Sequence, residues 1–581
     1  MDRDTRNLLA NTTQALRRGL EEEFALQLEG RFDVLRDGSI ADAPGPQLDD
    51  SEKLTRRKIV EAIHHRRASG DSERESVDGF LRETAFTFLN RLAALKMMEA
   101  RDIVQECVSA CDSHGFNARG FKEFGGLAPG LIDLPDGGYR LYLECIFDEI
   151  GREVGILFDR TDPASLLWPR RTALLDALGR INDPKLAGIW SEDETIGWIY
   201  QYYNDPEERR KMRNVKQGGS AAPRNSREMA VRNQFFTPRY VVEFLTDNAL
   251  GRLWYEMTGG RTKLRDTCRY LIRRSDEVFF AEPDSEEVRA AQQWLQNGQG
   301  EQPDLFVLAH VVNGYQRESD VTDSKLEERL ARIKGGSIED IDTQELLDTL
   351  FLVCRQERFC EGTLELFAGE TNLIQTLLDQ RIATSRLQDL SKEDQLKQPV
   401  FIPHRPLKDP RQIRMIDPAC GSMHFGLYTF DLLLVIYQEA WDLGLCPELQ
   451  RDYSTKDELM KDVPRLILEH NIHGIDIDPR AAQIAGLALW LRAQKAWHQQ
   501  GLRPAERPTV TRSNIVCAEP MPGEEDLLLR FVERSFPSSE RPFFTRLLGE
   551  IFKTMRLAGE AGSLLKIEDD VSALVAARRV R

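Results

Sequence analysis

The chain has 581 residues, of which 41 % are hydrophobic and 30 % are charged, and its formal net charge is −17. This composition is typical of a globular protein with several domains, and no apolar run approaches the ~20 residues of a membrane-spanning helix. The acidic net charge argues against a protein that coats nucleic acid non-specifically, although it is compatible with a local basic groove.

The N-terminus and the cysteines give expectations about the cellular compartment. The first residues, MDRDTRNLLANTTQALRRGLEEEF, are charged throughout and do not resemble a signal peptide. The nine cysteines lack the spacing of a disulfide framework. We therefore expect reduced thiols, a cytoplasmic location and no membrane partner.

Residues 1–204 are expected to form a helical N-terminal domain. In SVDGFLRETAFTFLNRLAALKMMEARDIVQECV, which begins at Ser76, apolar residues recur every three or four positions. This spacing is that of an amphipathic helix, and the sequence continues in the same style to residue 204.

A basic linker is expected at residues 205–234. It contains eight Lys and Arg residues but only four Asp and Glu residues, and its KQGGSAAPRNS stretch is rich in Gly, Ser and Pro. Such a linker is either solvated or contacts DNA phosphates, and the sequence alone leaves both interpretations open.

Residues 235–400 are expected to form one well-defined helix followed by an acidic, helical insertion. The helix is predicted from FFTPRYVVEFLTDNALGRLWYEM, because Thr237 suits an N-cap and Pro238 suits the first helical position. We expect Gly369 of the insertion to lie in a helix or a turn. A further helical segment is expected at residues 541–581.

Residues 401–540 change character, because predicted strands and helices alternate there. QIRMI, IHGIDID and PTVTRSNIV read as strands, the first ending at Asp417 and the second at Asp478. FGLYTFDLLLVIYQEAWDLG, VPRLILEHN and PRAAQIAGLALWLRAQKAWHQQ read as helices. This alternation predicts an α/β fold with a doubly wound, parallel, Rossmann-like sheet.

The turn DPACGS after the first strand is the strongest candidate for a binding site. Ligands of doubly wound sheets bind beyond the carboxyl ends of the strands, and Gly421 would let the backbone pass close to one. Asp476 or Asp478, at the end of the second strand, could accept hydrogen bonds from a ribose. The turn is not GxGxxG, so a nucleoside without a pyrophosphate is favoured; a purely structural turn also remains open.

Three motifs resemble those of a known family. DPACGSMHF resembles motif I, HGIDIDP motif II and QFFTP motif X of the gamma-class N6-adenine DNA methyltransferases, in the order of that class. The longer stretches IGWIYQYYN, NSREMAVRNQFFTPRYVVEFLTDNALGRLWYEM and PHRPLKDPRQIRMIDPACGSMHFGLY resemble the PglX-type enzymes of BREX phage-defence systems, with DISARM-type enzymes a close second. The resemblance implies S-adenosylmethionine as cofactor, double-stranded DNA as substrate and residues 401–540 as the methyltransferase core.

The resemblance also implies eight cofactor-binding residues: Thr237, Asp417, Ala419, Gly421, Phe425, Asp476, Ile477 and Asn514. In the family, the motif X threonine holds the cofactor's carboxylate and the motif I residues surround its methionine portion. The motif II acid binds the ribose hydroxyls, and the residue after it packs on the adenine. Asn514 stands where the family often has an Asp that recognises the adenine amino group, and an amide can both donate and accept.

Two departures from the family pattern limit these implications. Met423 replaces the usual glycine of motif I, and the catalytic Asn-Pro-Pro-aromatic motif is absent after Asn514. A methyltransferase must hold its target base in a pocket outside the stack, and that motif forms the pocket in the family. The catalytic residues are therefore not identified, no metal site is predicted, and the core is expected to be incomplete at its C-terminus.

Three functional interpretations follow from the sequence. The first is a site-specific adenine-N6 DNA methyltransferase in phage defence. The second is a non-catalytic or split N-terminal half that binds the cofactor and needs a second chain, or other defence-system proteins, for catalysis and target recognition. The third is a methyltransferase of small molecules or proteins, which the upstream FTP motif and the large helical extension make less favoured.

Overall fold

The computed structural model describes residues 2–68, 71–112, 115–204, 209–210, 212, 226–234, 237–274, 277–279, 289–290, 400–402, 405–518, 525–555 and 571–572. The chain divides into two compact units. The first unit comprises Met1–Val242, Pro410–Trp441 and Pro447–Arg581, and the second comprises Glu243–Asp409 and Asp442–Cys446. The helical N-terminal region and the strands after residue 410 thus belong to the same unit. The expectations for Gly369 and for residues 213–225 of the linker lie outside the described residues.

Helices build the N-terminal part of the first unit, as its periodicity predicts. The longer ones are α1 (Arg3–Phe32), α2 (Asp50–Ala68), α3 (Glu73–Glu99), α5 (Tyr139–Gly151), α7 (Arg171–Ile181) and α8 (Thr195–Tyr203). The shorter elements are β1 (Cys111–Asp112), β2 (Gly115–Phe116), α4 (Arg119–Leu127), α6 (Gly155–Phe158) and 3₁₀ turns at Pro129–Asp133, Pro135–Gly138, Pro163–Ser165 and Pro184–Ser191.

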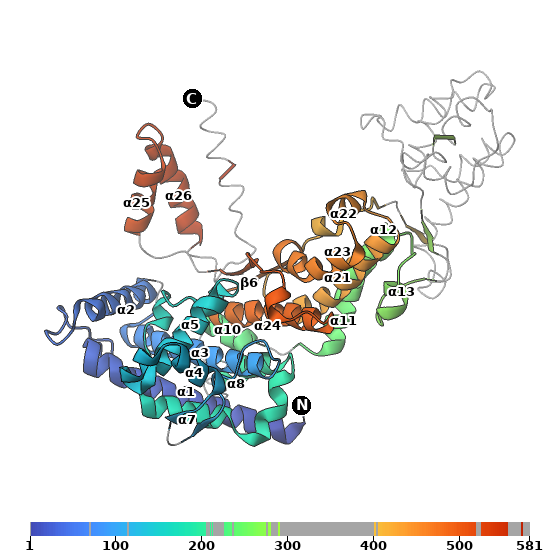
Figure 1. Cartoon of the computed structure of the whole chain (residues 1–581). Coiled ribbons are helices and arrows are strands. Elements are labelled where there is room, and N and C mark those ends of the chain that lie inside the picture. The colour runs from blue at the N-terminus through green and yellow to red at the C-terminus, as the bar shows by residue number, and fades with distance from the viewer. Residues whose placement is uncertain are drawn as a thin grey trace. The chain divides into compact units, whose positions relative to one another are not determined.

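Helix α3 lies at the centre of this helical region. A capping box between Ser72 and Glu75 fixes its first turn, and its apolar residues then pack against α1, α2 and α8. Most of α3 is buried around its whole circumference, whereas its amphipathic spacing predicts only one buried face. The reason is that α24 (Pro479–Gln499), from the far end of the sequence, also packs against it, as Figure 1 shows.

The first unit also contains a parallel sheet of three short strands, in the order β5 (Met415–Asp417), β6 (Ile472–Asp476) and β7 (Ile515–Cys517). Three predicted strand bounds were wrong. β5 begins at Met415 rather than at Gln412, which lies in the 3₁₀ turn Pro410–Gln412. β6 ends at Asp476 because Asp478 is already the N-cap of α24, and β7 pairs with β6 only from Ile515 rather than from residue 508. The described part of the chain is thus mostly helical with a small parallel sheet, which is compatible with part of a methyltransferase core.

Five helical segments surround these strands in the sequence: α21 (His424–Asp442), α22 (Pro447–Asp452), α23 (Lys456–Leu466), a π-helical turn (Ile467–Asn471) and α24. Short 3₁₀ turns lie at Pro410–Gln412 and Pro504–Glu506. Helix α24 is almost wholly buried, because its alanines let it approach β6, β7, α3 and α8 closely. Its Trp497 is fully buried, and the indole Nε1 donates to the Lys461 carbonyl at 2.7 Å.

The two faces of the sheet differ in their exposure. Ile472 and Ile515, which share one face, are only 1 % and 6 % exposed. On the opposite face, Ile416 of β5 is 61 % exposed and Val516 of β7 is 50 % exposed. Parallel sheets are normally covered on both faces, so an apolar face open to solvent is unusual.

The second unit begins within α11 (Arg239–Thr246), which confirms the helix predicted after Thr237 and Pro238. A π-helical turn (Asp247–Gly251), α12 (Arg252–Met257) and α13 (Leu264–Thr267) follow, and β3 (Glu277–Phe279) pairs in parallel with β4 (Val400–Ile402). The buried Asp247 accepts a hydrogen bond from the Tyr270 backbone N–H at 2.9 Å.

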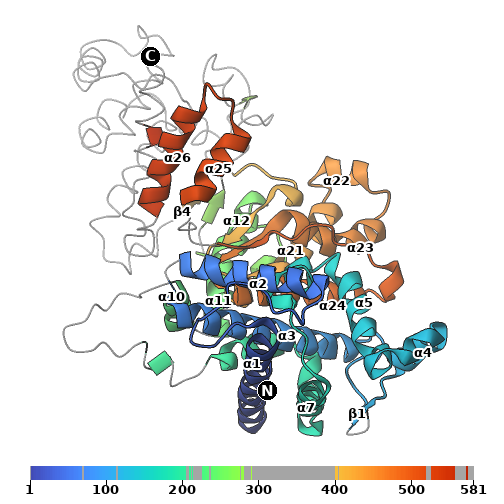
Figure 2. The same cartoon turned by 90° about the vertical axis from the view of Figure 1, so that its left-hand side faces the viewer.

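Near the C-terminus, α25 (Glu525–Ser535) and α26 (Arg541–Met555) lie side by side (Figure 2). The helix predicted after residue 541 is therefore present as far as Met555. Among the described residues, no helix combines the length and the apolar character that crossing a bilayer requires.

Candidate functional site

A cavity of about 370 Å³ lies where β5 and β6 end, within the first unit. We call it the strand-end cavity. Its lining residues are Gly197, Tyr200, Gln201, Met229, Ala230, Gln234, Pro418, Ala419, Gly421, Ser422, Asp476 and Ile477. They come from α8, from α10 (Ser226–Asn233) and the residue after it, from the turn after β5 and from the end of β6. The volume is within the range of small-molecule and cofactor sites.

Backbone hydrogen bonds hold the turn after β5 against β6. The Cys420 N–H donates to the Ile475 carbonyl at 2.9 Å, and Gly421 takes a positive φ of 53°. A Cβ at Gly421 would project into open space, so its absence leaves room for a ligand. Gly474 is needed for a different reason, because a Cβ there would lie 2.8 Å from Ile515 Cδ1.

Helix α8 passes directly over this turn. A Cβ at Gly197 would lie 3.3 Å from the Ser422 hydroxyl oxygen and 3.7 Å from His424 Nε2. The glycine therefore permits the close approach by which the N-terminal helical region forms one wall of the strand-end cavity.

Asp476 is the acidic residue of the cavity lining. Its carboxylate accepts hydrogen bonds from two backbone N–H groups, those of Gly421 and Asp478, both at 2.8 Å. Burial raises the pKa of Asp476 above its ordinary value, although these hydrogen bonds oppose the shift. The carboxylate thus joins the turn after β5 to the loop after β6, and it faces the cavity with acceptor capacity left.

Asp478, the other acid left open by the sequence, has a structural role. Its side chain caps α24 by accepting from the Arg480 N–H at 3.0 Å and pairs with the Arg480 guanidinium at 2.7 and 2.9 Å. Burial alone would raise the pKa of Asp478, but the charge and hydrogen bonds of Arg480 hold it below its ordinary value. Of the two acids, Asp476 is therefore the one whose carboxylate lines the strand-end cavity.

The structure brings together only some of the eight residues implied by the motifs. Ala419, Gly421, Asp476 and Ile477 line the strand-end cavity. The four that do not line it are Thr237, Asp417, Phe425 and Asn514.

Two of these four have other contacts. Asp417 accepts a hydrogen bond from the Ala419 N–H at 3.2 Å, and burial raises the pKa of the Asp417 carboxyl. Asn514 donates its side-chain amide to the carbonyls of Leu468 and Glu469 at 3.1 and 3.0 Å.

Sequence reasoning missed the wall formed by α8 and α10. Gln234 is the first residue of the QFFTP motif, and Tyr200, Gln201 and Met229 lie in the longer stretches that resemble the family, but the motifs assign a cofactor contact to none of the four. Contacts between distant segments bring them together: α24 packs against α8, and the Gln234 side-chain amide donates to the Tyr200 carbonyl at 3.4 Å.

Comparisons with known proteins agree with the motifs. The chain is 23 % identical over 430 residues to the adenine-specific methyltransferase BrxX of Escherichia coli O9:H4 (strain HS), covering 71 % of this chain and 24 % of that protein. It is 22 % identical over 521 residues to the adenine-specific methyltransferase PglX of Lacticaseibacillus casei (strain Zhang), covering 82 % of this chain and 32 % of that protein.

The chain resembles these adenine-specific methyltransferases. The resemblance predicted from the three motifs is thereby confirmed. No protein-family profile matches the chain. The chain spans about a quarter to a third of the length of the curated relatives that it matches.

Met423 is the position where this chain departs from motif I of such methyltransferases. It takes a positive φ of 65°, which explains why glycine is usual there. Its side chain is fully buried and does not line the strand-end cavity. It fills space beside Gly426 of α21, where an added Cβ would lie 2.5 Å from Met423 Cε. Met423 therefore does not narrow the cavity with its side chain.

This packing predicts that the effect of Gly426→Ala depends on Met423. In the wild-type chain the added methyl collides with Met423, and we expect Gly426→Ala to lower the free energy of unfolding by about 1 kcal/mol. In a Met423→Gly background the same methyl fills vacated space and favours the helix, so it should stabilise the chain. Urea unfolding of wild type, Gly426→Ala, Met423→Gly and the double variant measures how the effect of Gly426→Ala on the free energy of unfolding depends on Met423.

Gly179→Ala is the control, because a Cβ at this helical glycine of α7 meets nothing within 4 Å. It should stabilise the chain by about 0.5–1 kcal/mol in either background. If Gly426→Ala changed the free energy of unfolding equally in the wild-type chain and in Met423→Gly, that result would contradict the packing described for Met423.

Proposed function

We propose that the chain is the cofactor-binding part of a site-specific adenine-N6 DNA methyltransferase that acts in phage defence of the BREX type. The observation that carries this proposal is the strand-end cavity, where the motif I turn and the motif II acid Asp476 meet. The similarity to two adenine-specific methyltransferases supports the reaction class. The proposed cofactor is S-adenosylmethionine, the proposed partner is double-stranded DNA, and the proposed location is the cytoplasm.

The lining of the cavity fits S-adenosylmethionine. Asp476 offers acceptors for the two ribose hydroxyls, and Gly421 leaves space for the methionine portion beside Ala419. Ile477 offers an apolar surface for the adenine ring. When bound, S-adenosylmethionine supplies an electrophilic methyl group on its sulfonium sulfur. The residues of this chain would bind and orient it, since positioning is a large part of group-transfer catalysis.

The proposal also includes the four residues implied by the motifs that do not line the strand-end cavity. Asp417 shapes the turn through its hydrogen bond to Ala419, and Phe425 lies in the first turn of α21. Thr237, which precedes α11, is proposed to hold the cofactor's carboxylate. Asn514 would have to give up its contacts with two carbonyls to reach the adenine amino group.

A second candidate function is a cofactor-binding half that works only with a further polypeptide. The observation that favours it is the exposed apolar face of the sheet at Ile416 and Val516. A polypeptide that covers this face and adds the Asn-Pro-Pro-aromatic pocket would complete a site for the flipped base. The candidate partners are a C-terminal half of the enzyme or other proteins of the defence system.

The exposed face leads to a stability prediction. We expect Ile416→Thr to change the free energy of unfolding of the isolated chain by less than about 0.5 kcal/mol, because the side chain is already in water. Ile515→Thr is the matched control on the buried face and should cost about 2 kcal/mol, because it buries a hydroxyl and loses apolar contacts. Urea unfolding measures both variants. A cost for Ile416→Thr equal to that of Ile515→Thr would show that this face is covered.

The proposed function is tested by transfer of a tritiated methyl group from S-adenosylmethionine to unmethylated double-stranded DNA. An adenine-specific enzyme should label N6-methyladenine in the nuclease digest of the DNA. Cofactor binding without labelling would favour the half that needs a second chain. Labelling of a protein or small molecule, with no label on DNA, would contradict both the DNA methyltransferase and the cofactor-binding half that needs a second chain.

A further inference from the structure

A buried arginine connects α24 to the N-terminal helical region beside the strand-end cavity. The Arg480 guanidinium lies 5.7, 6.0 and 5.9 Å from the ring centroids of Phe86, Tyr200 and Tyr203. It also donates to the Asn204 side-chain oxygen at 3.0 Å. A cation enclosed by three rings and paired with a carboxylate is held in one place.

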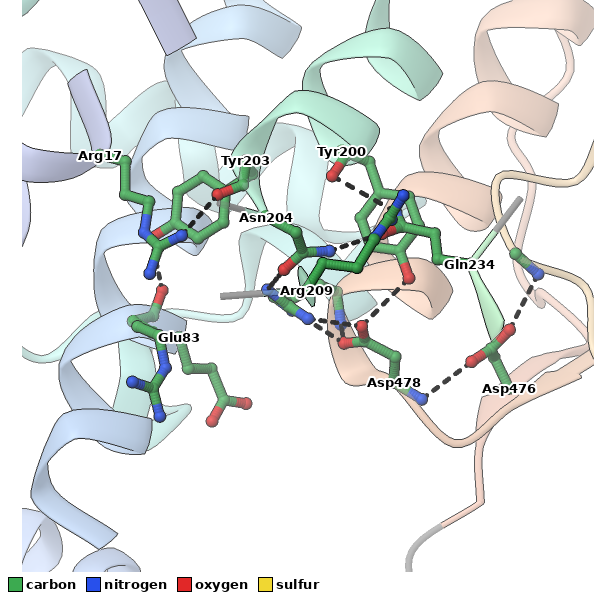
Figure 3. Close-up of polar contacts among 12 residues, drawn as sticks. Arg17, Glu83, Tyr200, Tyr203, Asn204, Arg209, Gln234, Asp476 and Asp478 are labelled. Atoms are coloured by element: carbon green, nitrogen blue, oxygen red, sulfur yellow. Dashed lines mark hydrogen bonds and ion pairs between the residues drawn. The ribbon is translucent and has the colours of Figure 1, made fainter. Parts of the chain in front are cut away.

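Tyr200 contacts both this cluster and the cavity. It lines the cavity, and its hydroxyl donates to the Asp478 carboxylate at 3.0 Å, as Figure 3 shows. The other described donors to the Asp478 carboxylate are the backbone and side-chain groups of Arg480, two residues away. Tyr200 is therefore the contact by which α8 holds this carboxylate directly.

The position of Asp478 in turn affects Asp476. The Asp478 N–H donates to the Asp476 carboxylate at 2.8 Å, and the other oxygen of that carboxylate accepts from the Gly421 N–H at 2.8 Å. A shift of the loop after β6 would therefore turn the Asp476 carboxylate relative to the Gly421 turn. A carboxylate that binds two adjacent hydroxyls depends strongly on this orientation.

We propose that Tyr200, a residue of the N-terminal helical region, positions the Asp476 carboxylate for the ribose hydroxyls of the bound cofactor by holding Asp478. This inference rests on the proposed cofactor role of the strand-end cavity. In this proposal the N-terminal helices contribute to cofactor binding, and Tyr200 is a positioning residue that acts through Asp478.

The test compares Tyr200→Phe with Tyr203→Phe in the full chain. Tyr203→Phe is the matched control, because its ring also lies against Arg480 while its hydroxyl donates to the Arg82 carbonyl at 2.8 Å. Calorimetric titrations use adenosine and 2′,3′-dideoxyadenosine, which lacks both ribose hydroxyls. We expect Tyr200→Phe to weaken adenosine binding roughly five- to tenfold and to change dideoxyadenosine binding less than about twofold. Tyr203→Phe should change neither affinity.

If Tyr200 had a merely structural role, Tyr200→Phe would weaken the binding of adenosine and of dideoxyadenosine equally, and that result would overturn the proposal. Unchanged adenosine binding would also overturn it. If Tyr200→Phe does not fold, Asn204→Ala replaces it, since it removes the hydrogen bond that the residue after α8 accepts from Arg480, the ion-pair partner of Asp478. Asn204→Ala should likewise weaken the binding of adenosine more than that of dideoxyadenosine. An equal loss of affinity for both nucleosides would again overturn the proposal. Failure of the wild-type chain to bind either nucleoside would overturn the proposed function, and the positioning role with it.

Discussion

Replacing Asp476 with alanine is expected to weaken binding of S-adenosylmethionine by about a hundredfold. Each hydrogen bond between a hydroxyl and a charged carboxylate contributes about 1.5–3 kcal/mol, and Asp476 is proposed to make two of them. The variant also loses the acceptor that joins the N–H groups of Gly421 and Asp478. Calorimetric titration of the variant and the wild-type chain measures the change.

Asp457→Ala is the control for this prediction. Asp457 is an exposed aspartate in the first turn of α23 and is absent from the lining of the strand-end cavity. It should leave the affinity unchanged. If Asp476→Ala bound the cofactor as tightly as Asp457→Ala does, Asp476 would not be the residue that contacts the ribose.

Asp478→Ala is expected to produce the largest loss of stability. The substitution leaves the buried Arg480 guanidinium without its carboxylate partner and removes the N-cap of α24. Removing one member of a buried ion pair typically costs about 3–5 kcal/mol. Urea unfolding followed by circular dichroism should therefore show a much lower midpoint for Asp478→Ala than for wild type.

The double variant Asp478→Ala/Arg480→Met is the informative comparison. It removes the buried charge as well as its partner, and the methionine occupies much of the arginine's volume within the aromatic rings. We expect it to be more stable than Asp478→Ala alone, because no uncompensated charge remains buried. A double variant no more stable than Asp478→Ala would contradict this electrostatic explanation.

The local features of the core could be predicted from sequence because they depend on short-range patterns. The apolar run before Asp417, the turn at Gly421 and the apolar helix that follows are each determined within a few residues. The same holds for α24, whose alanine and leucine content predicts a buried helix. These elements were sufficient to place Gly421 and Asp476 at neighbouring strand ends.

The remaining features depend on contacts between distant segments. Asp476 rather than Asp478 lines the strand-end cavity, because Asp478 is engaged by Arg480 and by Tyr200, which lies in a helix far from both acids in sequence. The end of β6 follows from the same contacts, because capping of α24 by Asp478 ends the strand two residues early.

The wall of the cavity formed by α8 and α10 likewise depends on contacts between distant segments, because α24 packs on α8 and Gln234, the residue after α10, donates to the Tyr200 carbonyl of α8. The orientation of Met423 toward Gly426 also depends on packing. Motif spacing shows only that glycine is usual at that position, and it carries no information about where a methionine side chain would point.

The central claim is that this chain forms a nucleoside-cofactor site at the ends of β5 and β6. Its most direct test is calorimetric titration of the purified, folded chain with S-adenosylmethionine. Binding at one site with micromolar affinity, competed by adenosine, is the predicted result. A folded chain that gives no binding heat with S-adenosylmethionine, and that retains no labelled S-adenosylmethionine above the free concentration in equilibrium dialysis, would contradict the claim.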